Sequence, residues 1–177
     1  MEKSKKVKIT LGLFYLLVVS SFLYFFLSKF TLAELTSYEF IKNNRDYFFE
    51  LKQTNLFLIS LAFLFFTIVW VVMAGFGSPI ALIAGVIFGK WLGTFVLTIG
   101  MTVGATILYI GANYFFKEII KEKFLTKFKS LEVKFKKSEF VYLLIYRFIG
   151  GIPFVISNIL PCIFNVKTSN FFWATII

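Results

Sequence analysis

Histidine is missing from this 177-residue sequence, and cysteine occurs once, as Cys162. The chain therefore lacks the side chains of the common Cys/His metal sites and of nucleophiles that histidine activates. Cys162 stands between Pro161 and Ile163, and such apolar surroundings are typical of a buried, unreactive thiol. These absences exclude an internal disulfide. They indicate a protein that is not an enzyme and that has no catalytic residue, metal ligand or cofactor.

Charged residues are also scarce, at 16%, whereas 59% of residues are hydrophobic and 26 are phenylalanine. Soluble domains carry about 25% charged residues, so lipid rather than water is the expected surrounding. The net charge of +10 comes almost entirely from lysines that flank apolar runs. This placement favours membrane lipids with an anionic surface as partners, and not nucleic acid. The composition predicts an all-α, polytopic helical protein of the cell membrane, and homo-oligomer formation is left open.

The sequence predicts an N-terminal anchor helix and a polar loop in the first part of the chain, residues 1–54. Residues 9–30 form an apolar run of about the ~20 residues that a spanning helix needs. The lysines before it place the N-terminus in the cytoplasm. A cleaved signal peptide is the alternative, but its apolar core is shorter and ends at small residues. Residues 55–76 contain no charge and predict a second span that returns the chain to the cytoplasmic side.

Residues 77–116 remain apolar for longer than one crossing requires and contain most of the glycines. Small residues recur at every fourth position, which gives a flat helix face for close packing. A second interpretation is a re-entrant helical hairpin that begins at Pro79, because broken helices occur in membranes where they are buried or line a cavity. Lys90, beside Trp91, fits an interface anchor better than a substrate contact. The positions assigned to the hairpin and to helix packing are Pro79, Gly85, Gly89, Gly93, Gly100 and Gly104.

Residues 117–140 are polar and basic, with an apolar residue every three or four positions. This spacing predicts an amphipathic helix, which either lies on anionic headgroups or docks its apolar side on the protein. The residues expected at the membrane surface are Lys121, Phe124, Lys127 and Phe128. Its side of the membrane depends on whether residues 77–116 return to their starting face, and we favour the cytoplasmic side.

Residues 140–165 are apolar over a spanning length but include several residues that a simple spanning helix avoids. Pro153 removes an amide donor, and Gly150 and Gly151 permit unusual backbone angles, so the helix should break there. With Pro161, these residues define a second candidate re-entrant hairpin, of the kind that forms transporter binding sites. Arg147, one of two arginines, should lie in a polar cavity or be paired at this depth.

Two blocks of residues resemble the VTT-domain membrane proteins, also called SNARE-associated Golgi protein-like and related to the bacterial DedA proteins. The first block runs from Pro79 through the glycines at 85, 89 and 93 to Gly104, and the second contains the arginine, proline-phenylalanine and asparagine signature. A third similarity, residues 171–175, looks like the start of the next helix. The residues of the second block are Tyr146, Arg147, Phe148, Pro153, Phe154, Asn158 and Pro161. The resemblance predicts a VTT-like membrane core over residues 55–177 that is truncated at its C-terminal end.

The resemblance implies two re-entrant hairpins entering from opposite faces and movement of phospholipid or polyprenyl phosphate between leaflets. In a bacterium it implies the inner membrane. Arg147 would hold the headgroup phosphate, with Asn158 and Pro153 as further candidate contacts. Arg147 could instead cap carbonyls freed by the helix break, and Asn158 could bond to the backbone.

Two departures bear on mechanism. Asn113 stands where many members carry arginine, and no Asp or Glu lies between Leu51 and Phe116, so an intramembrane carboxylate for proton coupling is lacking there. An ion-coupled small-solute transporter and a non-transport membrane scaffold are the alternative functions.

Overall fold

The computed structural model describes residues 2–29, 46, 50, 55–75, 77–115, 117, 135, 137–149 and 152–177. Within these ranges every regular element is helical, which confirms the all-α prediction. The elements are α1 (Glu2–Lys29), α5 (Leu56–Val72), α6 (Gly77–Phe115), α8 (Glu139–Phe148), α9 (Phe154–Ile159), the 3-10 helix η1 (Leu160–Phe164) and α10 (Thr168–Ile176). They form two compact units, Val19–Gly104 and Met1–Val18 with Ala105–Ile177, which are described separately. The expected surface residues Lys121, Phe124, Lys127 and Phe128 lie outside the described residues.

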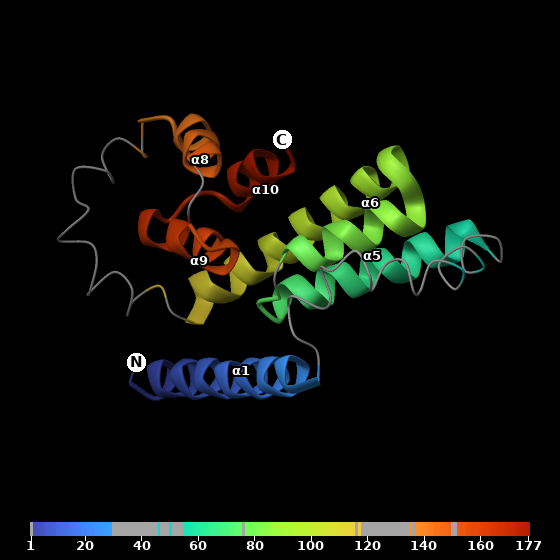
Figure 1. The fold of residues 1–177 in the computed structure, drawn as a ribbon. Coiled ribbons are helices and arrows are strands. Elements are labelled where there is room, and N and C mark those ends of the chain that lie inside the picture. Colours follow the sequence, from blue (N-terminus) through green and yellow to red (C-terminus); the bar gives the residue numbers. More distant parts are fainter. Residues whose placement is uncertain are drawn as a thin grey trace. The chain divides into compact units, whose positions relative to one another are not determined.

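The helix α6 is a helical hairpin. It bends sharply at Gly89, whose backbone has φ 74° and ψ −174°, a combination that is essentially restricted to glycine. A Cβ atom on Gly93 would lie 2.7 Å from the carbonyl oxygen of Ala84, and one on Gly77 would lie 3.0 Å from the Met101 side chain. These pairs would be far apart in a straight helix, which rises 1.5 Å per residue. The two limbs, residues 77–88 and 90–115, therefore run in opposite directions, as Figure 1 shows.

The longer limb of α6 packs closely along α5, in the same direction. A Cβ atom on Gly100 would lie 2.9 Å from the Thr67 side chain, and one on Gly104 would lie 2.8 Å from Val71. The two helices can therefore approach at these glycines because no side chain separates them. The same register places the hairpin tip at Gly89 level with the first residues of α5 (Figure 1).

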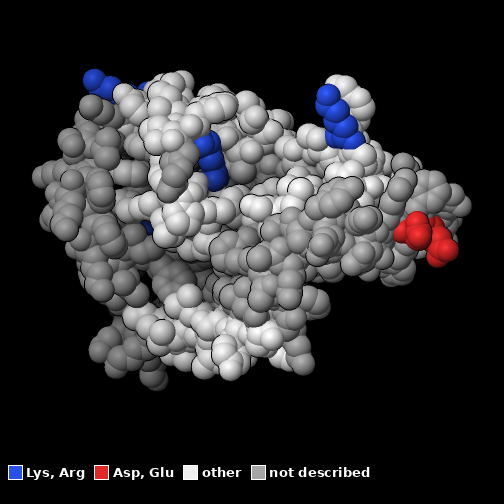
Figure 2. All heavy atoms as spheres, in the orientation of Figure 1, with Lys and Arg blue, Asp and Glu red and all other residues white. Residues whose placement is uncertain are grey.

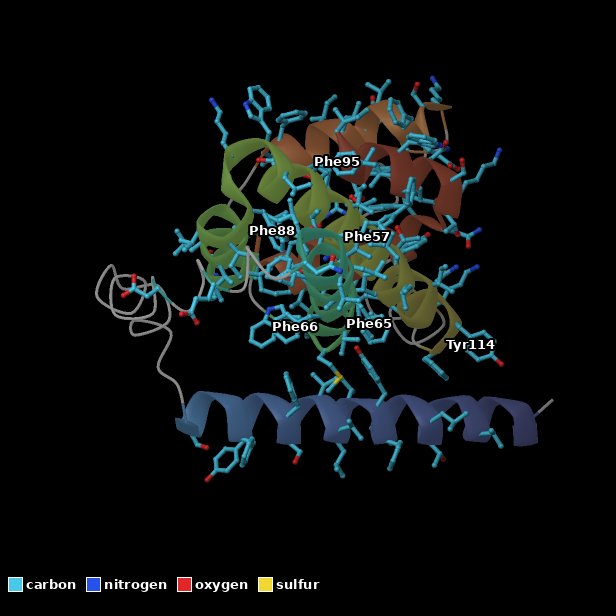
Figure 3. All side chains as sticks on the ribbon, turned by 90° about the vertical axis from the view of Figure 1, so that its right-hand side faces the viewer. Phe57, Phe65, Phe66, Phe88, Phe95 and Tyr114 are labelled. Atoms are coloured by element: carbon cyan, nitrogen blue, oxygen red, sulfur yellow. The ribbon has the colours of Figure 1, made fainter. Side chains whose placement is uncertain are left out.

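Large apolar side chains fill the core of this unit and also cover much of its outside. The core cluster joins α5 to both limbs of α6 and comprises Phe63, Trp70, Ile80, Ala84, Ile87, Phe88 and Val96. On the outside, Phe57 is 79% and Phe65 68% exposed, and Figure 3 labels them with other aromatic residues of α5 and α6. Such a large exposed apolar surface is typical of contact with lipid.

By length and composition, α6 is the one helix in the described ranges that could cross a bilayer. Shorter apolar helical stretches occur at Ile9–Phe22, Leu56–Val72 and Phe154–Phe164. Figure 2 shows one face of the molecule, on which the charged side chains among the described residues stand apart from one another, separated by described residues without charge. These features agree with a helical membrane protein. The re-entry of the hairpin into a membrane and the number of crossings stay predictions.

Candidate functional site

The candidate site surrounds Arg147, near the C-terminal end of α8, and belongs entirely to the unit that contains Ala105–Ile177. Glu139 holds the other end of α8 against α10, because its carboxylate accepts hydrogen bonds from the Lys167 backbone N–H and the Asn170 side chain. The helix α8 ends at Phe148, and α9 begins directly after Pro153. Pro153 is exposed and occupies the N-cap position of α9. The helix break predicted around Pro153 is therefore present. Gly150 and Gly151 lie outside the described residues.

Arg147 donates hydrogen bonds to three side-chain oxygens that come from α9 and α10. Its Nη1 atom is 3.1 Å from Ser157 Oγ and 2.8 Å from Asn158 Oδ1, and its Nη2 atom is 2.9 Å from Thr175 Oγ1. The guanidinium also lies over the Phe171 ring, 4.9 Å from its centroid. We call Arg147, Ser157, Asn158 and Thr175 the arginine cluster. The described partners are side chains, not backbone carbonyls.

Several buried polar atoms of the arginine cluster and its neighbour Tyr146 have no partner within the described part of the chain. They are Nε of Arg147, Nδ2 of Asn158 and the hydroxyl of Tyr146. Asn158 is fully buried, so its free amide donor is not satisfied by bulk solvent. A buried donor without a partner costs about 1–3 kcal/mol, which makes three such atoms close together a feature that requires an explanation. An acceptor bound among them would satisfy the two nitrogen donors.

The position of α10 is fixed by aromatic stacking on the end of α6. The Tyr109 and Phe171 rings are stacked with centroids 4.4 Å apart, and both side chains are fully buried. The Tyr109 hydroxyl donates to the Val166 carbonyl oxygen at 2.6 Å, and Lys117 donates to the Asn165 side chain. Since Phe171 and Thr175 are one helical turn apart, this stacking also positions Thr175 against Arg147.

The remaining site residues named from the sequence lie elsewhere. Pro161 is buried in η1, and Pro79 lies in the first turn of α6, where proline fits a helix start. Gly85 and Gly111 have open space around them, unlike Gly93, Gly100 and Gly104. The described residues contain no group of His, Cys, Asp and Glu that could hold a metal ion. Sequence reasoning missed the contacts of Ser157 and Thr175, and the signal that was present is that both are hydroxyl residues in otherwise apolar segments.

A family model for the VTT domain matches residues 75–177, which is more than half of the chain. The chain belongs to the VTT-domain family. VTT-domain proteins are membrane proteins of the DedA type, which agrees with the apolar surface and the candidate span. The match contains α6 and the whole arginine cluster, whereas α5 lies before it.

The chain is also similar to a curated bacterial protein. The chain is 31% identical over 104 residues to the "Uncharacterized protein YqeD" of Bacillus subtilis (strain 168), an alignment that covers 56% of this chain and 50% of that protein. The chain thus spans about half the length of this relative. No solved structure matches the chain.

Proposed function

We propose that this VTT-domain protein moves phosphate-bearing lipids, phospholipid or polyprenyl phosphate, between the two leaflets of a membrane, with Arg147 holding the headgroup phosphate. The observation that carries this proposal is a half-buried arginine whose described partners are all neutral. The partners expected of the protein are therefore membrane lipids. The proposal is one of transport and not of catalysis.

The charge of Arg147 is the first support. Hydroxyl and amide oxygens satisfy guanidinium N–H groups but do not neutralise a positive charge, and an uncompensated charge at bilayer depth is costly. A phosphate group supplies the missing negative charge. Arginine is suited to it, because its planar fork matches phosphate geometry better than the point charge of lysine does.

The donor count is the second support. Arginine has five N–H donors, and three are engaged by the arginine cluster, which leaves two, Nε among them. The free Nδ2 atom of Asn158 adds a further donor from the neighbouring helix. A phosphate has enough acceptor oxygens to bind several such donors at once.

A membrane scaffold is the second candidate, because one observation favours it. The three hydrogen bonds of Arg147 join α8 to both α9 and α10, so Arg147 also holds the fold together. If that were its complete role, lipid movement would not depend on it. The ion-coupled transporter has no comparable support in the described contacts.

The test is dithionite quenching of fluorescent phospholipid in proteoliposomes that contain the full-length protein. Arg147→Ala is expected to slow exchange between leaflets about 10- to 100-fold, since a hydrogen bond to a charged group contributes about 1.5–3 kcal/mol. Arg147→Lys should be intermediate, because it keeps the charge but loses the fork. Lys137→Ala, at an exposed lysine next to α8, removes the same charge and should leave the rate unchanged.

All variants are compared at equal incorporation, verified by the amount of protein per vesicle and by their melting temperatures in detergent. A stable Arg147→Ala protein that exchanges lipid at the wild-type rate would show that Arg147 is structural and would favour the scaffold. If the wild-type protein exchanges no lipid between leaflets, phospholipid scrambling is rejected as its function.

A further inference from the structure

A cavity of about 470 Å³ lies beside the arginine cluster, within the same unit of the chain. It is partly open to the outside, and its volume falls within the range of about 300–1,000 Å³ that small-molecule sites occupy. Its wall comes from Phe135, from α8, from Ile149 and Ile152, and from η1. Residues of the wall include Phe135, Tyr142, Ile145, Tyr146, Leu160 and Pro161.

The wall of the cavity is almost entirely apolar. The Phe135 and Phe164 rings are stacked at 4.2 Å, and the Tyr142 ring lies 5.6 Å from that of Phe135, so aromatic faces make up much of it. A headgroup placed there would lose its hydration without gaining hydrogen bonds, which is strongly unfavourable. A hydrocarbon chain would lose nothing and would gain contact with close-packed side chains.

Tyr146 connects the cavity to the arginine cluster. It lines the cavity, and its buried hydroxyl interacts with Ser157 and Arg147. Leu160, also on the wall, follows Asn158 by two residues at the start of η1. The two regions therefore adjoin, one apolar and one cationic with unused donors.

We infer that the cavity binds one hydrocarbon chain of the lipid whose phosphate lies at Arg147, an inference that rests on the proposed function. The two adjoining regions favour a lipid as the occupant, because one lipid molecule supplies both a phosphate for Arg147 and a hydrocarbon chain for the cavity. The helix of a second copy would fill the apolar cavity but leave the charge and the free donors unmet. The occupant is thus a phosphate-headed lipid, with its chain beside Tyr146.

The experiment uses the full chain in proteoliposomes with two photoactivatable probes that carry the same diazirine-labelled acyl chain. One probe is phosphatidylglycerol, and the other is diacylglycerol, which lacks the phosphate. After illumination, cross-linked residues are mapped by mass spectrometry. We expect the phosphatidylglycerol probe to label Tyr142, Ile145 and Leu160, and we expect the diacylglycerol probe to lose most of this labelling.

Two variants of α8 test whether the chain enters the cavity. Ile145→Trp places a large ring in the wall, whereas Val141→Trp makes the same change one turn away, outside the wall, and the two positions are 50% and 48% exposed. Ile145→Trp should lose most labelling of Tyr142 and Leu160, and Val141→Trp should retain it. Arg147→Ala should reduce labelling of the cavity by the phosphatidylglycerol probe but not general labelling of exposed residues.

Equal labelling of the cavity by both probes, or equal labelling in Ile145→Trp and Val141→Trp proteins of matched melting temperature, would overturn the inference. So would labelling confined to exposed positions, which is the outcome expected if protein fills the cavity. If any of these results accompanies lipid exchange that depends on Arg147, the chain site is wrong and the proposed function stands. Phosphate-dependent labelling of the cavity without lipid exchange supports the chain site and contradicts the function.

Discussion

At the scale of single residues, the hydrogen-bond acceptors of Arg147 are neutral, whereas a buried arginine is more commonly paired with a carboxylate. Asn158 differs from aspartate by one polar group, and its Oδ1 atom already accepts from Arg147 at 2.8 Å. Asn158→Asp would therefore place a negative charge at hydrogen-bond distance from the guanidinium with little change in shape. The charge of Arg147 would be balanced within the protein, and an incoming phosphate would be repelled.

We predict that Asn158→Asp keeps or raises the melting temperature while lipid exchange falls to the level of Arg147→Ala. Asn158→Leu, in contrast, should lower the free energy of unfolding by about 1–3 kcal/mol, because a charged donor loses its acceptor. Both are measured by thermal melting in detergent and by dithionite quenching. Normal exchange in a stable Asn158→Asp protein would contradict the assignment of Arg147 as the phosphate site.

Only some members of the arginine cluster could be found from the sequence. An arginine within an apolar span is conspicuous, and so is an asparagine beside a helix break. Thr175 is 28 residues from Arg147, and its contact depends on α10 docking through Phe171, which no local pattern specifies. The burial of the Tyr146 hydroxyl likewise cannot be predicted from the sequence, because it depends on the residues packed around it.

At the scale of elements, the glycines of α6 look alike in sequence but have different structural roles. Their four-residue spacing indicated one continuous face, yet Gly89 ends the first limb and Gly93 packs against the backbone of Ala84 across the bend. Gly85 has open space where its side chain would be. Spacing predicts that small residues share a helix face, but it does not predict which of them adopts a positive φ.

These roles predict different effects of the same substitution. Gly93→Ala should lower the free energy of unfolding by about 1–3 kcal/mol, because its Cβ atom would overlap a backbone oxygen that cannot move freely. Gly85→Ala should be neutral or stabilise α6 by up to about 0.5–1 kcal/mol, because alanine favours a helix. Thermal melting of the two variants in the same detergent makes the comparison. Equal losses would mean that the limbs are not packed as described.

At the scale of the whole molecule, the direction of α6 bears on the side of the membrane at which the basic segment begins. The longer limb runs in the same direction as α5, so the chain leaves the hairpin toward the side on which α5 ends. If α5 returns to the cytoplasm, as the lysines before α1 indicate, Lys117 lies on the cytoplasmic side too. A hairpin that enters the membrane and returns to its starting face thus agrees with the positive-inside rule.

We predict the following labelling by a membrane-impermeant maleimide in whole cells, with the buried Cys162 replaced by serine. Single cysteines at Lys3 and Lys127 should react only after the membrane is opened, and one at Asn43 should react in intact cells. Lys90→Cys, at the hairpin tip, should behave like Asn43→Cys, because the tip is level with the start of α5. Labelling of Lys127→Cys in intact cells would reverse the arrangement.

The neutral surroundings of Arg147 have an electrical consequence. With three uncharged partners, the empty cluster carries one net positive charge, and a bound phosphodiester headgroup cancels it. A unit charge that crosses the full membrane potential gains or loses about 2.3 kcal/mol per 100 mV. A phosphodiester lipid held at Arg147 would therefore form a neutral pair with the guanidinium, and the membrane potential would act on its passage less strongly than on the passage of the charged lipid alone.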